Sequence, residues 1–298
     1  MPRQRIGWIG TGVMGRSMCS HIIHAGFTVM VYTRTKEKAS SLLEGGAVWC
    51  DSPGEVARES DMIFTMVGYP EDVEEVYFSG TGLIENAKPH TIYVDMSTSR
   101  PSLAQRISRA AQDSMCHALD APVSGGDVGA REGTLAIMVG GDRETFEKIL
   151  PLFKILGKNI SLMGGPGAGQ HTKMCNQILI ASTMIGVVES LLYACRAGLD
   201  PEAVIDIIST GAAGSWSLNN LGRRIVKGDY DPGFFIKHFI KDMGIALDEA
   251  RRMKLCLPGL ALACQFYVSA SALGYEDLGT QGLYRVLARM NGVQAGPR

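Results

Sequence analysis

The chain has 298 residues, of which 46% are hydrophobic and 20% are charged. Its 29 lysine and arginine residues nearly balance 30 aspartate and glutamate residues, so the net charge is −1. This balance argues against a nucleic-acid-binding protein, and the apolar share can build a large core, which excludes a disordered chain. The 36 glycines exceed the usual share of ~7% and favour tight turns and close backbone contacts with a ligand.

The cysteines and the N-terminus indicate the compartment. Seven cysteines are dispersed without a C-x-x-C pair, which is typical of reduced thiols and predicts neither disulfides nor a metal site. The longest strongly apolar run, residues 178–188, is shorter than the ~18 residues that cross a bilayer, so no membrane segment is expected. A strand pattern begins by Arg5 and leaves no room for a targeting peptide. We expect a cytoplasmic protein.

Strand and helix patterns alternate through the first half of the chain. Apolar runs predict strands at residues 6–9, 27–32, 47–49, 62–67 and 92–94. Between them, helices are predicted over 13–25, over 35–43, after Ser52 with a capping box to Glu55, after Pro70 and after Pro101. This alternation is the pattern of a parallel sheet covered by helices on both faces, and it predicts an α/β domain over residues 1–162.

The second half has helical spacing and no strand pattern. Residues 168–197 predict one long helix, which we expect to run from the first domain into the second. Further helices are predicted over 201–209, 215–226, 238–253, 258–273 and 280–290. Residues 163–298 are therefore expected to form an all-α domain.

A glycine-rich turn follows the first predicted strand and opens the first predicted helix. Its sequence is G-T-G-V-M-G, comprising Gly10, Thr11, Gly12, Val13, Met14 and Gly15. Glycines at this spacing allow a tight turn, close approach of a pyrophosphate and close helix packing, while the helix N-terminus attracts the phosphates. The alternative is a turn without a ligand, but the surrounding strand–turn–helix order favours dinucleotide binding.

The end of the second predicted strand bears on the choice between NADP and NAD. An acid normally contacts the adenosine ribose there, but this chain has Thr33, Arg34 and Thr35, with Lys38 one turn later. Arginine can pair with a 2′-phosphate, which a carboxylate would repel. The sequence therefore favours NADP, with NAD as the alternative if these are ordinary surface charges.

Two later segments carry residues suited to acid–base chemistry. The loop D-A-P-V-S-G-G ends in Ser124, Gly125 and Gly126, whose hydroxyl and backbone N–H groups can hold a small carboxylate. In G-A-G-Q-H-T-K-M-C-N-Q, Lys173 lies one turn into the long helix and shares a helix face with Asn176 and Gln177. A lysine buried beside a cofactor can act as general acid and base. Taken alone, each segment could equally be a loop or a solvated helix.

Together these segments resemble the β-hydroxyacid dehydrogenase family over nearly the whole chain. The resemblance implies a Rossmann domain followed by an all-α domain, an active site between them, a small carboxylate-bearing substrate and a homodimer or homotetramer. It also implies that Lys173 is catalytic and that the loop from Ser124 to Gly126 binds the substrate carboxylate. Other implied contacts are Val67, Gly68, Thr98 and Lys241 for the cofactor and Phe234 and Asp242 for the substrate.

Some points stay open from the sequence. The family often has Asn four residues after the lysine, whereas this chain has Gln177 there and Asn176 before it, so either amide could assist Lys173. Thr33–Thr35 resembles NADP-preferring members, while Gly126–Asp127 resembles the tartronate semialdehyde branch, which leaves the substrate unassigned. Lys241 and Asp242 could instead be a surface pair.

Two other functions compete with this interpretation. The first is imine reduction on the same fold, and Lys173 argues against it. The second is a non-catalytic assembly module, and the lack of extra domains and basic linkers argues against it.

Overall fold

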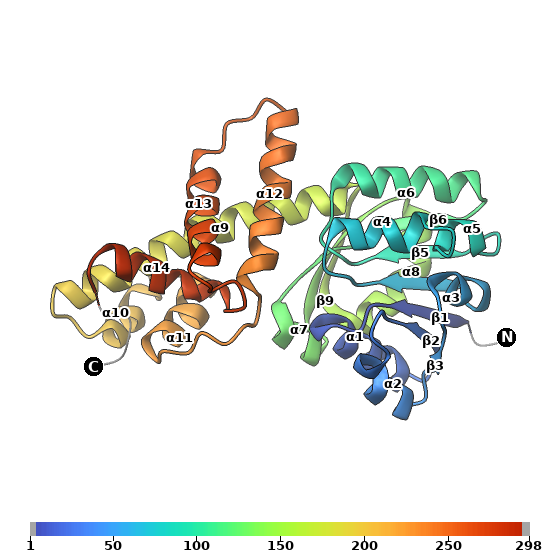
Figure 1. Ribbon diagram of the computed structural model, residues 1–298, viewed down its shortest axis with the longest axis horizontal. Coiled ribbons are helices and arrows are strands. Elements are labelled where there is room, and N and C mark those ends of the chain that lie inside the picture. The colour runs from blue at the N-terminus through green and yellow to red at the C-terminus, as the bar shows by residue number, and fades with distance from the viewer. Residues whose placement is uncertain (1–3, 294–298) are drawn as a thin grey trace. The chain divides into compact units, whose positions relative to one another are not determined.

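The computed structural model describes residues 4–293. Within that range the first half builds one nine-stranded sheet in the order β3-β2-β1-β4-β5-β6-β8-β7, with β9 paired to β8 (Figure 1). The strands are β1 (Arg5–Ile9), β2 (Thr28–Tyr32), β3 (Val48–Trp49), β4 (Met62–Thr65), β5 (Ile92–Asp95), β6 (His117–Asp120), β7 (Val123–Ser124), β8 (Leu135–Gly140) and β9 (Gly157–Gly164). The first six strands are mutually parallel, and the first five of them correspond to the five predicted strands.

The strand order reverses between β1 and β4, because β2 and β3 continue on one side and β5 and β6 on the other. Such a topological switch point opens a crevice at the carboxyl ends of the central strands, where α/β proteins bind ligands. The glycine-rich turn follows β1 directly. The fold therefore puts the predicted dinucleotide site at the expected edge of the sheet.

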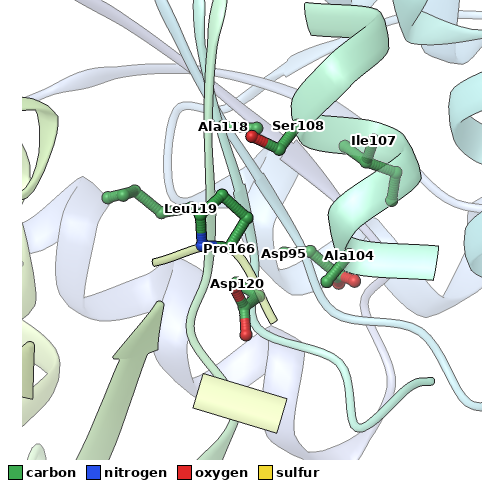
Figure 2. Close-up of a pocket in the computed structure, with 8 residues that line it drawn as sticks. All are labelled: Asp95, Ala104, Ile107, Ser108, Ala118, Leu119, Asp120 and Pro166. Carbon is green, nitrogen blue, oxygen red and sulfur yellow. The ribbon is translucent and has the colours of Figure 1, made fainter. Parts of the chain in front are cut away.

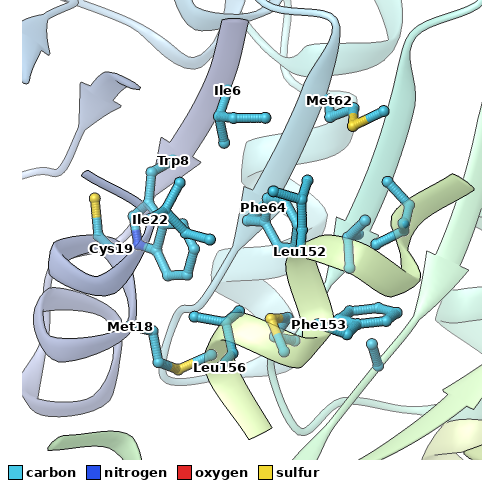
Figure 3. Packing of buried hydrophobic residues seen from close by; sticks show 14 of the residues in the cluster. Ile6, Trp8, Met18, Cys19, Ile22, Met62, Phe64, Leu152, Phe153 and Leu156 are labelled. Atoms are coloured by element: carbon cyan, nitrogen blue, oxygen red, sulfur yellow. The ribbon is translucent and has the colours of Figure 1, made fainter. Parts of the chain in front are cut away.

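Helices cover both faces of this sheet (Figure 1). They are α1 (Val13–His24), the 3₁₀ turn η1 (Lys36–Ala39), α2 (Ser40–Glu44), α3 (Pro53–Glu59), α4 (Pro70–Phe78), α5 (Leu83–Asn86), α6 (Pro101–Asp113), α7 (Gly126–Glu132) and α8 (Arg143–Leu156). On one face Trp8 stacks on Phe64 with ring centroids 5.5 Å apart, and Phe64 meets Phe153 of α8 edge-on (Figure 3). On the other face Tyr77 of α4 packs edge-on against Tyr93 of β5. The two buried layers explain why the central strands are apolar on both sides.

Several local predictions need correction. Residues 35–43 form a 3₁₀ turn followed by a short α-helix rather than one helix. Ser52 caps α3 through the Glu55 N–H, but the Glu55 carboxylate accepts from the Asp51 N–H, so the reciprocal capping box is absent. Strands β7 to β9 and helices α7 and α8 were not predicted, and β8 runs antiparallel to β6 and β7.

The second half is all-helical within the described residues apart from one isolated bridge, at Phe235 and Gly279. Its elements are α9 (Ala168–Arg196), α10 (Pro201–Ile208), a π-helical turn η2 (Ser217–Gly222), α11 (Arg223–Val226), α12 (Ile236–Arg252), α13 (Pro258–Ala272), the 3₁₀ turn η3 (Thr280–Gly282) and α14 (Leu283–Met290). Met184, Val188 and Phe239 belong to its separate core. The predicted all-α half is thus confirmed.

The chain divides into two compact units between Lys173 and Met174, inside α9. The sequence instead placed the division at residue 162, before this helix. The first turn of α9 belongs with the sheet because Gly167 and Gln170 donate backbone hydrogen bonds to Asp120 at the end of β6.

Helix α9 is also long and apolar enough to cross a membrane, by length and composition alone. The expectation that no segment reaches this limit is therefore wrong, because the helix extends well beyond residues 178–188. A core helix of a globular unit meets the same criteria. Ala181, Met184 and Val188 of α9 are buried in the second core, so one face of this helix packs inside the second unit.

Candidate functional site

The turn after β1 has the shape that a dinucleotide pyrophosphate requires. Gly10 has φ of +93°, and a Cβ there would lie 2.2 Å from the Met66 carbonyl oxygen. A Cβ on Gly15 would lie 2.2 Å from the Gly10 carbonyl oxygen, so both positions need glycine. At Gly12, by contrast, a Cβ would meet nothing within 4 Å. This open approach to the backbone, ahead of the twelve-residue helix α1, fits phosphate groups at a helix N-terminus.

The intervening residues of the motif differ in exposure. Thr11 is buried, Met14 packs against the core of the first face, and the Val13 side chain is half-exposed at the first residue of α1. Only Gly12 and Val13 therefore offer substantial surface to a bound molecule in this turn.

Arg34 follows β2 and extends into solvent, where its Nη1 lies 2.8 Å from Oδ1 of Asp72 near the start of α4. The other oxygen of Asp72 accepts a hydrogen bond from the Tyr69 N–H. Thr33 is half-buried, whereas Thr35 and Lys38 are exposed. The sequence indicated no carboxylate beside this arginine; the fold supplies one from α4. Asp72 is thus a candidate cofactor-site residue that sequence reasoning missed, although its place behind Pro70 marked it as a helix N-terminal acid.

The predicted cofactor contacts after β4 and β5 lie together. The Val67 N–H donates to the Ser97 hydroxyl over 2.9 Å, which joins the Val67–Gly68 turn to the loop Ser97–Ser99. Thr98 lies half-buried in this loop. These two turns are at the carboxyl edge of the sheet that also carries Gly10 and Gly12.

Lys173 and the Ser124 loop are brought together within the first unit. The buried Lys173 Nζ donates a 2.8 Å hydrogen bond to the carbonyl oxygen of Val123, the residue before Ser124. Ser124 ends the short strand β7, and Gly125 and Gly126 have φ of +128° and +62° as the chain turns into α7. The lysine, the hydroxyl and the two glycine N–H groups thus belong to one structural group.

Asp120 anchors the helix that carries this lysine. Its carboxylate accepts hydrogen bonds from the Gly167 N–H at 2.7 Å and the Gln170 N–H at 2.8 Å. Burial raises the pKa of Asp120 above its usual range, and the backbone donors counter this only in part. Asp120 is the first residue of the loop D-A-P-V-S-G-G, and the sequence predicts no role for it. Its signal is an acid placed where β6 ends, but the helix N-terminus that it contacts is that of α9, which begins only at Ala168.

Asp95 and Asp120 are register partners on β5 and β6 and line a small cavity beneath α6 (Figure 2). The volume of about 10 Å³ is close to that of one water-sized probe. This cavity is too small for a substrate.

In the second unit, four predicted residues form one connected polar group. Asn176 Nδ2 donates to Gln177 Oε1 at 2.7 Å, and Gln177 Nε2 donates to Asp242 Oδ2 at 2.6 Å. Lys241 Nζ lies 3.0 Å from Asp242 Oδ1 as an ion pair without hydrogen-bond alignment. Asp242 is fully buried, so it is not a surface residue, and its carboxylate contacts Gln177 and Lys241.

Phe234 is half-buried and packs edge-on against Phe239, with ring centroids 5.8 Å apart. This contact anchors it to the second core. Among residues 4–293, no three His, Cys, Asp or Glu side chains gather as metal ligands would.

Two family descriptions match successive parts of the chain. Residues 5–165 match the NAD binding domain of 6-phosphogluconate dehydrogenase, and residues 167–287 match the NAD-binding domain of NADP-dependent 3-hydroxyisobutyrate dehydrogenase. Together with the open glycine turn, these matches define an NAD(P)-dependent oxidoreductase with a nicotinamide cofactor.

Individual relatives narrow the class. The chain is 53% identical over 290 residues to 3-hydroxyisobutyrate dehydrogenase-like 1, mitochondrial, of Arabidopsis thaliana, covering 97% of this chain and 86% of the relative. It is 40% identical over 286 residues to 2-hydroxy-3-oxopropionate reductase of Escherichia coli, covering 96% and 98%. The solved Mycobacterium tuberculosis 3-hydroxyisobutyrate dehydrogenase superposes with a TM-score of 0.88 at 29% identity, covering 96% and 99%. The chain belongs to the β-hydroxyacid dehydrogenase family.

Similarity in fold alone extends to a more distant enzyme. An imine reductase of a Pseudomonas species superposes with a TM-score of 0.62 at 18% identity, covering 96% of this chain and 99% of that one.

Proposed function

We propose that this enzyme oxidises a small β-hydroxy acid, or reduces the matching aldehyde acid, with Lys173 as general acid and base. The observation that carries the proposal is the 2.8 Å hydrogen bond from Lys173 Nζ to the Val123 carbonyl. It holds a buried ammonium beside a hydroxyl and two glycine N–H groups, on the sheet edge that carries the open glycine turn. A proton donor and a carboxylate-binding loop thus belong to the same unit as the dinucleotide turn.

The chemistry divides between the cofactor and the protein. When bound, a nicotinamide cofactor would supply the hydride chemistry at the hydroxyl-bearing carbon. In oxidation Lys173 acts as the neutral amine and takes the hydroxyl proton, which makes it the ammonium; in reduction the ammonium donates that proton to the carbonyl oxygen. Its present acceptor, the Val123 carbonyl, holds the ammonium in place until substrate oxygen competes for one of its three protons.

Ser124 and the backbone N–H groups of Gly125 and Gly126 would hold the substrate carboxylate. The left-handed conformation of both glycines turns the backbone sharply, and successive N–H groups in such a turn can form a concave anion site. A neutral hydroxyl and two N–H groups fix the acid without a bulky side chain. This arrangement favours a short substrate.

Asn176 is the better candidate to assist the lysine. It follows Lys173 by three positions on α9, so the two share a helix face. Gln177 already donates to Asp242 and accepts from Asn176. We assign Gln177, Asp242 and Lys241 to orienting Asn176 and lining the second unit, and we keep Lys241 as the proposed contact with the nicotinamide.

NADP is the proposed cofactor, with NAD as the weaker alternative. Arg34 is 70% exposed, which leaves it accessible to a 2′-phosphate, and Lys38 adds a second exposed positive charge nearby in the chain. Asp72 opposes this preference by occupying one side of the guanidinium.

The test is a panel assay of purified protein with NADPH and short aldehyde acids, including 2-hydroxy-3-oxopropionate and the semialdehyde of 3-hydroxyisobutyrate, whose parent names occur among the relatives. We expect reduction of at least one aldehyde acid and none of cyclic imines. Turnover of imines alone would favour the imine reductase alternative. Binding of neither dinucleotide would favour a non-catalytic module.

A further inference from the structure

Gln170 lies in the first turn of α9 with its side chain completely buried. Both ends of its amide are used: Oε1 accepts from the Ser99 N–H at 2.9 Å, and Nε2 donates to the Ser97 carbonyl at 2.8 Å. Its own backbone N–H donates to Asp120. One residue thus ties the helix to two different strand ends.

The Ser97–Ser99 loop, to which the Gln170 side chain is hydrogen-bonded, carries one of the proposed cofactor contacts and adjoins another. Thr98 lies between the two gripped residues, and the Ser97 hydroxyl accepts from the Val67 N–H of the neighbouring turn. Removing the Gln170 amide would therefore loosen the Ser97–Ser99 loop directly and the Val67–Gly68 turn through Ser97. Both segments are proposed to contact the dinucleotide.

The same residue is one helical turn before Lys173. Residues three apart on a helix are neighbours on one face, so the grip on the Ser97–Ser99 loop also limits the movement of the lysine. We propose that Gln170 is a positioning residue, which fixes Lys173 relative to the cofactor loop so that proton and hydride transfer occur in register. This inference rests on the proposed function of Lys173.

The two partners, the Ser99 N–H and the Ser97 carbonyl, require a side chain with one acceptor and one donor. A neutral amide offers one acceptor and one donor head, whereas a carboxylate offers two acceptors and would face the Ser97 carbonyl with repulsion. A protonated carboxylic acid regains a donor. Gln170→Glu should therefore work when protonated and fail when ionised, and burial raises the pKa of such a carboxyl into a measurable range.

The experiment compares wild type, Gln170→Glu and Gln170→Met for NADPH-dependent reduction from pH 5 to 9. We expect Gln170→Glu to approach wild-type kcat at the acidic end and to lose roughly 10- to 100-fold at the alkaline end, as for small misplacements of reacting groups. KM and NADPH affinity should stay within about twofold of wild type. Gln170→Met should lose kcat at every pH.

Gln112→Glu, the same substitution at an exposed position at the end of α6, is the matched control and should follow the wild-type profile. Amide exchange at Ser99 supplies a readout without turnover and should accelerate in Gln170→Met. The positioning role is wrong if wild type is active and Gln170→Glu shows the same pH profile as wild type. It is also wrong if Gln170→Met retains the wild-type kcat. Inactive wild type with accelerated Ser99 exchange would instead defeat the proposed function and leave the anchoring intact.

Discussion

Lys173 is joined to Val123 by a hydrogen bond across 50 positions of sequence, from the lysine ammonium to a backbone carbonyl. Because the acceptor is a backbone carbonyl, it is retained when the Val123 side chain is substituted. The contact therefore keeps the lysine ammonium next to the loop, and a shift of the loop would shift the lysine with it. Ser124 follows directly in that loop. One segment therefore holds both the proton donor and the carboxylate-binding hydroxyl. The distance between them depends on the Lys173–Val123 hydrogen bond and on the peptide bond from Val123 to Ser124.

The first prediction concerns the lysine itself. Lys173→Ala should fold and bind NADPH but lose turnover by a factor on the order of 10² to 10⁴, the usual contribution of a positioned acid or base. Lys173→Arg should fail similarly, because a guanidinium does not give up its proton. Steady-state kinetics with NADPH titration checks both, and Lys158→Ala, at an exposed lysine of β9, is the control. A Lys173 variant that kept most of its turnover at neutral pH would remove the lysine from the mechanism.

The second prediction concerns Arg34. Arg34→Asp should weaken NADP binding by about 1.5–3 kcal/mol, roughly 10- to 150-fold, through loss of a charged hydrogen bond. NAD binding should change much less, because NAD lacks the 2′-phosphate. Fluorescence titration with NADPH and NADH measures the two affinities. Equal losses for both would show that another residue reads the ribose.

The third prediction follows from the ion pair with Asp72. Asp72→Asn removes a negative charge 2.8 Å from the Arg34 guanidinium and should strengthen NADPH binding up to roughly fivefold, since solvent-screened charge pairs contribute about 1 kcal/mol or less. NADH binding should be nearly unchanged. The same titration at low and high salt checks the electrostatic origin, because screening should reduce the gain. Weaker NADPH binding would mean that Asp72 serves mainly to orient the arginine.

The glycine turn and the long helix were predictable because their signals are local. Gly10, Gly12 and Gly15 lie within six residues, and α9 carries its apolar pattern continuously along one segment. The grouping of Lys173 with Ser124 came from the family resemblance, since spacing alone cannot bring together residues that are distant in sequence. The structure supplies the reason, which is the bond to Val123.

Long-range contacts of single side chains could not be predicted. Asp72, Asp120 and Gln170 act through partners on other elements, and no local period encodes such pairs. Strand β8 is different, because its sequence L-A-I-M-V-G is an apolar run that could have indicated a strand. Its antiparallel pairing with β6 and β7 breaks the alternating pattern that guided the rest of the prediction.

The fourth prediction uses the raised pKa of Asp120. A carboxyl whose folded pKa lies above its unfolded value contributes stability that is present below the unfolded pKa and is lost as pH rises through the folded pKa. The free energy of unfolding of wild type minus that of Asp120→Asn should therefore be larger near pH 4 than at pH 8. Urea unfolding at both pH values measures it, with Asp113→Asn, at an exposed carboxylate, as the control. A difference that grows with pH would reverse the sign of the shift.

The last prediction is self-association through the helical unit. Phe266, Tyr267 and Val268 form a short apolar run in α13, but Tyr267 is fully buried, where its hydroxyl donates to the Thr280 carbonyl. Val268 is exposed, and so are ten further large apolar side chains of this unit, namely Leu179, Tyr193, Leu199, Ile207, Trp216, Met253, Leu255, Leu262, Leu273 and Met290. Each of these side chains is stabilised when a second copy of the chain covers it, and oligomers are usually symmetric. Light scattering at micromolar concentration should give a dimer or tetramer mass. Tyr193→Glu should lower that mass while Met115→Glu, at an exposed methionine of the first unit, leaves it unchanged; a wild-type monomer would contradict the prediction.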